Sequence, residues 1–289
     1  MNKKVLVTGG AGFIGSHLCE ALLRKADYEV FSLDNYSNGS RGNHIDGVSY
    51  IKGETSDIDN LINFTPNLLY HLGEYSRVEQ SFGEIEKVYQ SNVHGTFRVL
   101  QFAQKNNCKL IYAGSSTKFG DGGLGRHQTP YGWAKASNSD LVDNYMHWYG
   151  LNAATVYFYN AYGPREINSG KYATLIAIFK EQMRKNGKLT VVSPGTQLRN
   201  FTHVYDIVKG LVLVGELGVG GDYGIGHDKS YSILDIANAF GGDINMLPER
   251  PGNRMSAEVR TDKTKSLGWS AKMDVMDYIV EAKEQEFLF

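Results

Sequence analysis

The chain has 289 residues, enough for one large domain or two modest ones with a sizeable hydrophobic core. Its 30 basic and 31 acidic residues give a formal net charge of −1, so it offers no polybasic surface to nucleic acid or an anionic membrane, and an anionic ligand must be bound by a few placed side chains. Its two cysteines, Cys19 and Cys108, provide no disulfide framework, which favours a reducing, cytoplasmic location.

Short apolar runs alternate with helix-like segments through the first half of the chain. We expect strands at residues 5–8, 29–33, 48–51, 68–72, 109–112 and 152–159, and helices at residues 16–25, 92–106 and 131–149. Strands that alternate with helices form right-handed βαβ units, which place the strands in a parallel sheet covered on both faces. The predicted fold class is therefore α/β, with a Rossmann-type doubly wound parallel sheet in a first domain over residues 1–158.

The second half of the chain is less regular. We expect helices at residues 172–185, 204–217 and 233–240, a strand at 189–192, and turns at the glycine clusters 218–221 and 241–242. This pattern indicates a smaller α/β domain over residues 159–289, with residues 200–217 packing back on the first domain. Because no long linker separates the two, the cleft between them is the expected site.

No segment is expected to enter a membrane. The apolar run at residues 5–8 is too short for the core of a signal peptide. A longer apolar stretch at residues 207–219 is interrupted by Lys209 and Glu216, so it cannot span a bilayer.

A glycine-rich turn lies between the first predicted strand and the first predicted helix. Residues 8–15 read TGGAGFIG, which fits Gly-x-Gly-x-x-Gly from Gly10 and Gly-x-x-Gly-x-x-Gly from Gly9. Glycines there permit a tight turn and the close approach of a pyrophosphate. The free N–H groups at the N-terminus of the helix then bind the negative charge of the pyrophosphate. Asp34 ends the second strand about 20 residues beyond Gly15, where a carboxylate bonds the ribose hydroxyls and repels a 2′-phosphate. The pattern predicts NAD rather than NADP; the alternative is a turn in another α/β protein.

A second candidate constellation lies on the helix at residues 131–149. Tyr131 and Lys135 are four residues apart and therefore share one helix face. Residues 115–117 (Ser-Ser-Thr) follow a predicted strand, so they should lie at the carboxyl edge of the sheet, where sites of α/β proteins form. The alternative for the Tyr/Lys pair alone is a solvated helix surface.

Simple electrostatics tests whether Tyr131 could act as a base near pH 7. Tyrosine titrates near 10, so about 3 units, or roughly 4 kcal/mol, must be supplied. Lys135 at ~6 Å in an effective dielectric of ~20 supplies about 2.8 kcal/mol, and the positive charge of an oxidised nicotinamide a similar amount. Two cations suffice, whereas one alone falls short.

Taken together, these motifs resemble the extended short-chain dehydrogenases of the NAD-dependent epimerase/dehydratase family, typified by UDP-glucose and UDP-N-acetylglucosamine 4-epimerases. The resemblance covers nearly the whole chain, because several spaced motifs occur in the family's order. They are the glycine turn and residues 34–39, 71–73, 92–96, 115–117, 131–135, 160–165, 199–206 and 250–253.

The resemblance implies roles for individual residues. Tyr131 would be the acid/base, Lys135 would lower its pKa and hold the nicotinamide ribose, and Thr117 would bond the sugar hydroxyl being oxidised, with Ser116 nearby. The implied NAD site consists of Gly9, Gly12, Phe13, Ile14, Gly15, Asp34, Asn35, Ser37, Asn38, Glu54, Thr55, Leu72, Gly73, Asn92, Ser115, Tyr131, Lys135 and Phe158. The implied substrate site consists of Thr117, of Asn160, Arg199 and Arg250 at the diphosphate, and of Thr174, Leu175, Thr190 and Val192 at the base.

The residues after Thr117 bear on the reaction. Family dehydratases carry Asp-Glu directly after the active-site threonine and decarboxylases carry a glutamate in that segment, whereas Lys118 and Phe119 follow here. The resemblance therefore implies epimerisation: Tyr131 takes a hydroxyl proton, hydride passes to NAD, the keto sugar turns over, and hydride returns to the other face. A UDP-hexose or UDP-N-acetylhexosamine, inverted at C4, is the expected substrate.

Three features depart from the family's pattern. The segment 117–131 is short, and Glu74 stands where relatives have a small residue, near the expected sugar pocket. Spacing across residues 250–262 is wide, so the residue that gates sugar size is not fixed. The candidates Ala257 and Val259 are both small, which favours room for an N-acetyl group.

Other readings of the same sequence stay open. One is a nucleotide-sugar reductase or an epimerase of another carbon, and the other is a non-catalytic NAD-binding protein; consumption of NADH or NADPH separates a reductase from an epimerase. His94 and His203 are interpreted as packing or hydrogen-bonding residues, and no His/Cys/Asp spacing indicates a metal. The helices at residues 92–106 and 131–149 resemble the pair through which relatives form a four-helix-bundle homodimer.

Overall fold

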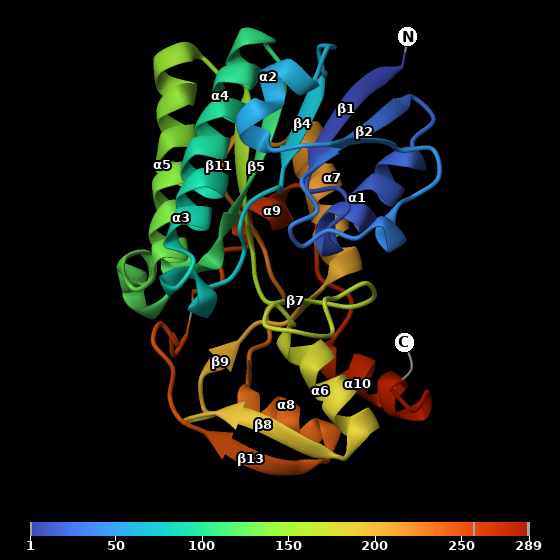
Figure 1. The fold of residues 1–289 in the computed structure, drawn as a ribbon, viewed down its shortest axis with the longest axis vertical. Helices are drawn as coiled ribbons and strands as arrows, with labels where there is room; N and C mark the ends of the chain where they lie inside the picture. Colours follow the sequence, from blue (N-terminus) through green and yellow to red (C-terminus); the bar gives the residue numbers. More distant parts are fainter. Residues whose placement is uncertain (1, 257, 288–289) are drawn as a thin grey trace.

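The computed structural model describes residues 2–256 and 258–287. Its first lobe is built round a seven-stranded sheet in which every neighbouring pair is parallel (Figure 1). The strands, in spatial order, are β11 (Gly220–Ile225), β6 (Ala153–Phe158), β5 (Lys109–Ser115), β4 (Leu68–His71), β1 (Lys3–Thr8), β2 (Tyr28–Asp34) and β3 (Ser49–Lys52). From β1 the chain builds the sheet first toward β3 and then toward β6. The predicted doubly wound Rossmann-type fold is confirmed.

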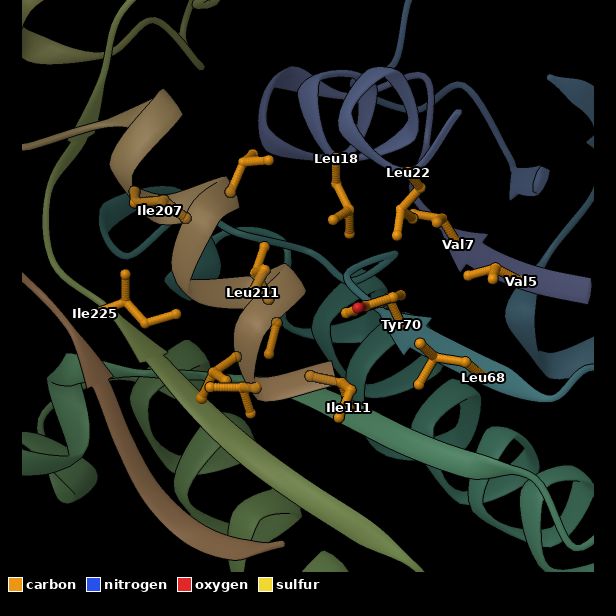
Figure 2. Packing of buried hydrophobic residues seen from close by; sticks show 14 of the residues in the cluster. Val5, Val7, Leu18, Leu22, Leu68, Tyr70, Ile111, Ile207, Leu211 and Ile225 are labelled. Atoms are coloured by element: carbon orange, nitrogen blue, oxygen red, sulfur yellow. The ribbon is translucent and has the colours of Figure 1, made fainter. Parts of the chain in front are cut away.

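Helices cover both faces of this sheet. One face packs against α1 (Phe13–Leu23) and α7 (Val204–Leu217), and the other against α4 (Gly95–Lys105) and α5 (Pro130–Tyr149). Side chains alternate between the faces: Val5 and Val7 of β1 join the cluster beneath α1 and α7, which Figure 2 shows, whereas Leu6 joins the other. The strand sequences are continuously apolar because both faces are buried.

The second lobe has its own hydrophobic core. A parallel pair, β8 (Lys188–Val192) and β13 (Asp243–Leu247), packs with α6 (Leu175–Lys185), α8 (Ile233–Phe240) and α10 (Val275–Glu284) (Figure 1). Helix α8 begins at a capping box, in which the Ser232 and Asp235 side chains each accept a backbone N–H of the other, and it ends at the left-handed Gly241.

The remaining α-helices and strands are short. They are the helices α2 (Ile58–Leu61), α3 (Ile85–Val88) and α9 (Asp262–Ser266), and the two-residue strands β7 (Ala161–Tyr162), β10 (Thr202–His203), β9 (Leu198–Arg199) and β12 (Tyr231–Ser232). Among the described residues, no helix is both long and apolar enough to cross a membrane.

Several elements differ from the sequence-based expectation. Strand β11 begins inside the glycine cluster where we expected only turns, and β13 and α10 were not anticipated at all. The helix expected at residues 92–106 is α4 preceded by a π-helical stretch, Tyr89–His94. Helix α7 packs on the large sheet, and β11 extends that sheet, so the chain returns to the first lobe after leaving it. Whether each lobe folds as a separate domain stays a prediction.

Candidate active site

The glycine turn forms a backbone-lined cradle between β1 and α1. Gly9 has a φ of +77°, in the left-handed region that favours glycine, and a Cβ there would lie 2.9 Å from the Cα of Gly73. A Cβ on Gly15 would lie 2.0 Å from the Gly9 carbonyl oxygen. Side chains are therefore excluded, and the N-terminal N–H groups of α1 face an open space suited to a pyrophosphate.

Asp34 lies at the carboxyl end of β2, where the ribose of a dinucleotide is bound in such folds. Its side chain accepts N–H groups of Ala11 at 2.9 Å and Tyr36 at 2.8 Å, which fixes its orientation. Burial raises the pKa of Asp34, and these two hydrogen bonds act in the opposite direction. The carboxylate lines the cavity, where it would repel a 2′-phosphate.

A cavity of about 440 Å³ runs from this turn to the start of α5. It brings together 17 of the 18 residues predicted for the cofactor: Gly9, Gly12, Phe13, Ile14, Gly15, Asp34, Asn35, Ser37, Asn38, Glu54, Thr55, Leu72, Gly73, Ser115, Tyr131, Lys135 and Phe158. Ser116 and Thr117 line it as well, and so do the predicted substrate residues Asn160, Thr174 and Leu175.

Asn92, the remaining residue predicted for the cofactor, does not line this cavity. It is fully buried, its Oδ1 accepts the Tyr75 N–H at 2.7 Å, and its Nδ2 donates to the Tyr75 carbonyl at 2.9 Å. Because the side chain binds both backbone groups of one residue, it holds the loop that follows β4.

The candidate catalytic residues meet at the far end of the cavity. Thr129 caps α5 by accepting the Gly132 N–H at 2.9 Å, which places Tyr131 and Lys135 in the first two turns of the helix. Strand β5 ends at Ser115, and the Thr117 hydroxyl donates to the Ser115 Oγ at 2.9 Å. Tyr131, Lys135 and Thr117, the residues predicted for catalysis, therefore line the same cavity.

Glu74 forms a buried ion pair with Lys135, whose Nζ also donates to the Ala113 carbonyl at 2.6 Å. The two charged side chains are 1% and 6% exposed. The Glu74 Oε1 accepts the Thr96 hydroxyl at 2.9 Å and the Asn138 Nδ2 at 2.9 Å, so the carboxylate is held from several directions. Glu74, the departure noted in the sequence, thus lies against the candidate catalytic lysine.

His71 extends the polar network around Glu74. Its Nε2 lies 3.0 Å from the Thr96 hydroxyl and its Nδ1 lies 2.7 Å from the Thr8 hydroxyl. Burial lowers the pKa of His71 to about 4, so the ring is neutral near pH 7. The network fixes Glu74 without adding a second cation beside it.

The ion pair changes the electrostatics expected at Tyr131. Because the Glu74 carboxylate is bound to the Lys135 ammonium, its negative charge offsets part of the attraction that Lys135 alone would offer a phenolate. Lys135 then acts on Tyr131 mainly as one end of a dipole. Other cations must therefore contribute if Tyr131 is to work as a base near pH 7.

Two arginines that sequence reasoning missed lie at this end of the site. Arg254, in the loop between β13 and α9, donates from Nη2 to the Ser116 Oγ at 3.3 Å. Arg77, in the loop after β4, lines the same cavity. Burial lowers the pKa of both guanidinium groups. In each case the strongest opposing effect is the electrostatic interaction with Tyr131, which raises the arginine pKa. No local pattern marks either residue, because each approaches Tyr131 from a segment distant in sequence.

A second cavity, of about 350 Å³, opens beside the first. Seven predicted substrate residues line it: Thr117, Asn160, Leu175, Thr190, Val192, Arg199 and Arg250. The Arg250 Nη1 lies 2.7 Å from the Glu79 carboxylate, and burial lowers the pKa of Arg199 to about 10. Because Thr117, Asn160 and Arg254 line both cavities, the two spaces meet beside the candidate catalytic residues.

A family model described as the NAD dependent epimerase/dehydratase family matches residues 5–226. The chain belongs to this family. UDP-glucuronic acid decarboxylase 6 of Arabidopsis thaliana is 28% identical over 96% of this chain and 86% of its own length. A putative UDP-glucose 4-epimerase of Methanocaldococcus jannaschii is 27% identical over 95% of each chain. The UDP-glucose 4-epimerase of Thermus thermophilus, in complex with NAD, superposes with a TM-score of 0.87 at 25% identity, covering 98% of each chain.

NAD is the cofactor of this epimerase/dehydratase, and the residues present fit it. The side-chain-free cradle accommodates a pyrophosphate, and Asp34 occupies the ribose position. In the part of the chain that the structure describes, no three His, Cys, Asp or Glu side chains are placed to hold a metal ion. His203, interpreted as a packing or hydrogen-bonding residue, caps α7 and contacts the ring of Tyr162.

The short segment 117–131 is packed against the loop that carries Arg254. The Asp121 Oδ1 accepts the N–H groups of Met255 at 3.0 Å and Ser256 at 3.2 Å, so the two loops form one wall. Of the candidates for gating sugar size, Ala257 lies outside the described residues and Val259 lines neither cavity.

Proposed function

We propose that this protein is an NAD-dependent epimerase of a nucleotide-diphosphate sugar, and that it inverts C4 of a UDP-linked sugar by transient oxidation to a keto sugar. One observation carries the proposal. The Tyr131, Lys135 and Thr117 side chains line the NAD cavity, and Thr117 also lines the second cavity at the point where the two meet. A sugar held there would present its hydroxyl to Tyr131 and its ring hydrogen to the nicotinamide.

The chain's own residues would move the proton. Tyr131 takes the proton of the sugar hydroxyl while Thr117 bonds the same oxygen, and Tyr131 returns the proton after the keto sugar has turned over. Bound NAD supplies the hydride acceptor, and it is regenerated when the hydride returns. No net oxidant is therefore consumed, which distinguishes an epimerase from a reductase.

The residues around Thr117 favour epimerisation over elimination or decarboxylation. Lys118 lies 3.0 Å from the Asp140 carboxylate, and Phe119 packs edge-on against Tyr157, so neither supplies an extra acid. Glu74 is bound to Lys135 and held by Thr96 and Asn138. The names of the relatives do not distinguish between these reactions, because one relative is a decarboxylase and another is a putative 4-epimerase.

The second cavity supports a nucleotide diphosphate as the other part of the ligand. Arg199 and Arg250 are available to a dianionic diphosphate, which guanidinium groups bind in fork geometry. Leu175, Thr190 and Val192 would flank the base from α6 and β8. The names of similar enzymes contain UDP-sugars, which supports uridine as the base.

Proton NMR tests the proposal directly. The purified protein, without added cofactor, would be incubated with UDP-glucose, UDP-galactose and their N-acetyl and uronic acid counterparts. A second anomeric signal that reaches the same ratio from either direction is the expected result. If no sample changes, even with NAD added, the epimerase proposal fails; consumption of NADH or NADPH would then indicate a reductase.

We also propose that the enzyme is a homodimer formed through α4 and α5, which lie side by side on one flank of the sheet (Figure 1). Large apolar side chains are exposed on these helices, including Phe97 (39%), Trp148 (61%) and Tyr149 (56%). A second copy would cover them. Light scattering should give twice the mass of the chain at micromolar concentrations, and a monomer mass would contradict the proposal.

The proposed location is the cytoplasm. Cys19 and Cys108 are free and buried, and burial raises the pKa of both thiols to about 12. Unpaired thiols of this kind are compatible with a reducing compartment.

A further inference from the structure

Arg254 occupies a position between the two cavities with part of its hydrogen-bonding capacity unused. It lines both spaces, and its Nη2 donates to the Ser116 hydroxyl at 3.3 Å. Its Nη1 is buried and makes no hydrogen bond to any described residue. The carboxylate of Asp121 acts on it only at longer range, because that group is already bonded to Gln128, Met255 and Ser256. A buried guanidinium nitrogen without an acceptor is costly unless a ligand supplies one.

Arg77 adds a second guanidinium to the same end of the site. Its Nη1 donates to the Ser76 carbonyl at 3.1 Å, its Nη2 donates to the Tyr172 carbonyl, and its Nε is buried without a partner. Its bonded acceptors are two backbone carbonyls and, at 3.5 Å, the Ser76 hydroxyl, all of them neutral, so Arg77 forms no ion pair with a described carboxylate. Together with Arg254, it places two guanidinium groups in the cavity lining that contains Tyr131, and neither is hydrogen-bonded to a described carboxylate.

The other cations of the site already have assigned partners. Lys135 is balanced by Glu74, and Arg250, which is paired with Glu79, is assigned to the diphosphate. Arg199 lies farther along the second cavity, where it is available to the diphosphate. The pyrophosphate of NAD would be bound by the N-terminal N–H groups of α1 and needs no further cation. Arg77 and Arg254 therefore remain for an anion at the reacting end.

We propose that the sugar of the substrate carries a carboxylate, as in a nucleotide-linked hexuronic acid, and that Arg254, with Arg77, binds this carboxylate. This inference rests on the proposed function and deepens it. A hexuronic acid differs from a hexose at C6, next to the ring atoms that Thr117 and Tyr131 would address. A carboxylate at that position, where the two cavities meet, would lie beside guanidinium groups from both residues, because Arg77 lines the first cavity and Arg254 lines both.

Two other anions could use these guanidinium groups, and each makes a different prediction. If Arg254 binds the diphosphate, its loss should weaken every UDP ligand equally. If the two arginines serve only the phenolate of Tyr131, affinity should not depend on a sugar carboxylate. Ligands that share the UDP group and differ only in the sugar separate these cases.

The experiment is calorimetric titration of the NAD-loaded enzyme with UDP, UDP-glucose, UDP-glucuronate and UDP-galacturonate. In the native protein, at least one uronate should bind roughly ten- to a hundred-fold tighter than UDP-glucose, the range expected for charge-assisted hydrogen bonds. In Arg254→Met this preference should disappear, while affinity for UDP and UDP-glucose stays within about threefold. Arg250→Met is the matched control and should weaken all four ligands.

Equal affinity for uronates and UDP-glucose in the native protein would overturn the inference. So would a preference that survives in Arg254→Met, or a loss of affinity for all four ligands in that variant. Arg77→Met, made in parallel, tests the same preference if Arg254→Met does not fold with NAD bound. Failure of UDP itself to bind the native protein would overturn the proposed function, which is a distinguishable result.

Discussion

The two ends of the active site bind charge in different ways. At the cofactor end, Gly9 and Gly15 remove side chains so that backbone N–H groups face the pyrophosphate, and Asp34 is the only predicted acidic contact at the ribose. At the reacting end, Glu74, Lys135 and two arginines surround Tyr131. The cofactor end therefore depends on backbone shape, whereas the reacting end depends on a balance of charges between distant segments.

The largest effect should follow from removing the Tyr131 hydroxyl, which lies in the cavity expected to hold both NAD and the sugar. Tyr131→Phe removes the proposed proton acceptor, so turnover should fall by roughly a thousand-fold or more. The glycine cradle is untouched, so bound NAD should stay at the native level. Product formation by NMR and NAD release on denaturation measure the two quantities. Substantial remaining activity would remove Tyr131 from the mechanism.

Glu74→Gln breaks the charge balance at the reacting end. The variant leaves Lys135 as a buried cation without a counter-ion, so the free energy of unfolding should fall by about 3–5 kcal/mol. The amide oxygen can still accept the Thr96 and Asn138 hydrogen bonds, whereas the amide nitrogen would face Lys135, so the hydrogen bond to the ammonium is lost together with the charge. The lysine would then act on Tyr131 undiminished, so turnover below pH 7 should rise relative to turnover at pH 8.

Chemical denaturation and a pH–rate profile test this variant. The matched control, Glu79→Gln, removes the partner of Arg250 in a pair whose side chains are each 44% exposed, and it should cost less than about 1 kcal/mol. In Glu74→Gln/Lys135→Met the two changes should cost less together than their sum. Additive costs would show that the buried pair is not coupled.

Gly15→Ala tests whether NAD binding depends on the shape of the glycine turn, because it adds a methyl group without changing any charge. The new methyl group would lie 2.0 Å from the Gly9 carbonyl oxygen, so the turn must shift, at an expected cost of about 1–3 kcal/mol. NAD should bind roughly ten- to a hundred-fold more weakly. Gly42→Ala is the control, since its methyl group would meet only the Ser40 Oγ at 3.4 Å. Equal NAD content in both variants would contradict the role of the cradle.

The same contrast explains what could be predicted from the sequence. The glycine turn, Asp34 and the Tyr131–Lys135 pair are local patterns, and their elements follow from local periodicity. The partner of Lys135 lies 61 residues away, and Ser116 and Arg254 are 138 residues apart, so no window of sequence brings them together. Strand β11 was missed for a related reason: its glycines read as a turn, and only pairing with β6 makes them a strand.

The smallest expected effect concerns Glu166, a carboxyl group in the segment that leads from the first lobe into α6. It accepts the Gly163 N–H at 2.8 Å and the Thr174 hydroxyl, and burial raises its pKa to about 7. A carboxyl pKa raised by folding makes the native state hold its proton more tightly than the unfolded chain does. Its stabilising contribution is therefore present below about pH 4.5 and is lost as the pH rises toward 7.

Replacing this carboxyl group should weaken the pH dependence of the free energy of unfolding without disrupting the packing of the second lobe. In Glu166→Gln, which can keep both hydrogen bonds, the loss of stability between pH 5 and pH 8 should be smaller than in the native protein by about 1–2 kcal/mol. Urea denaturation at the two pH values measures the difference. Glu181→Gln on α6 should leave the dependence unaltered, because Lys185 and Arg184 lower the pKa of the Glu181 carboxyl and keep it ionised at both pH values. If the native protein and Glu166→Gln lose the same stability between the two pH values, the pH dependence arises from a group other than Glu166.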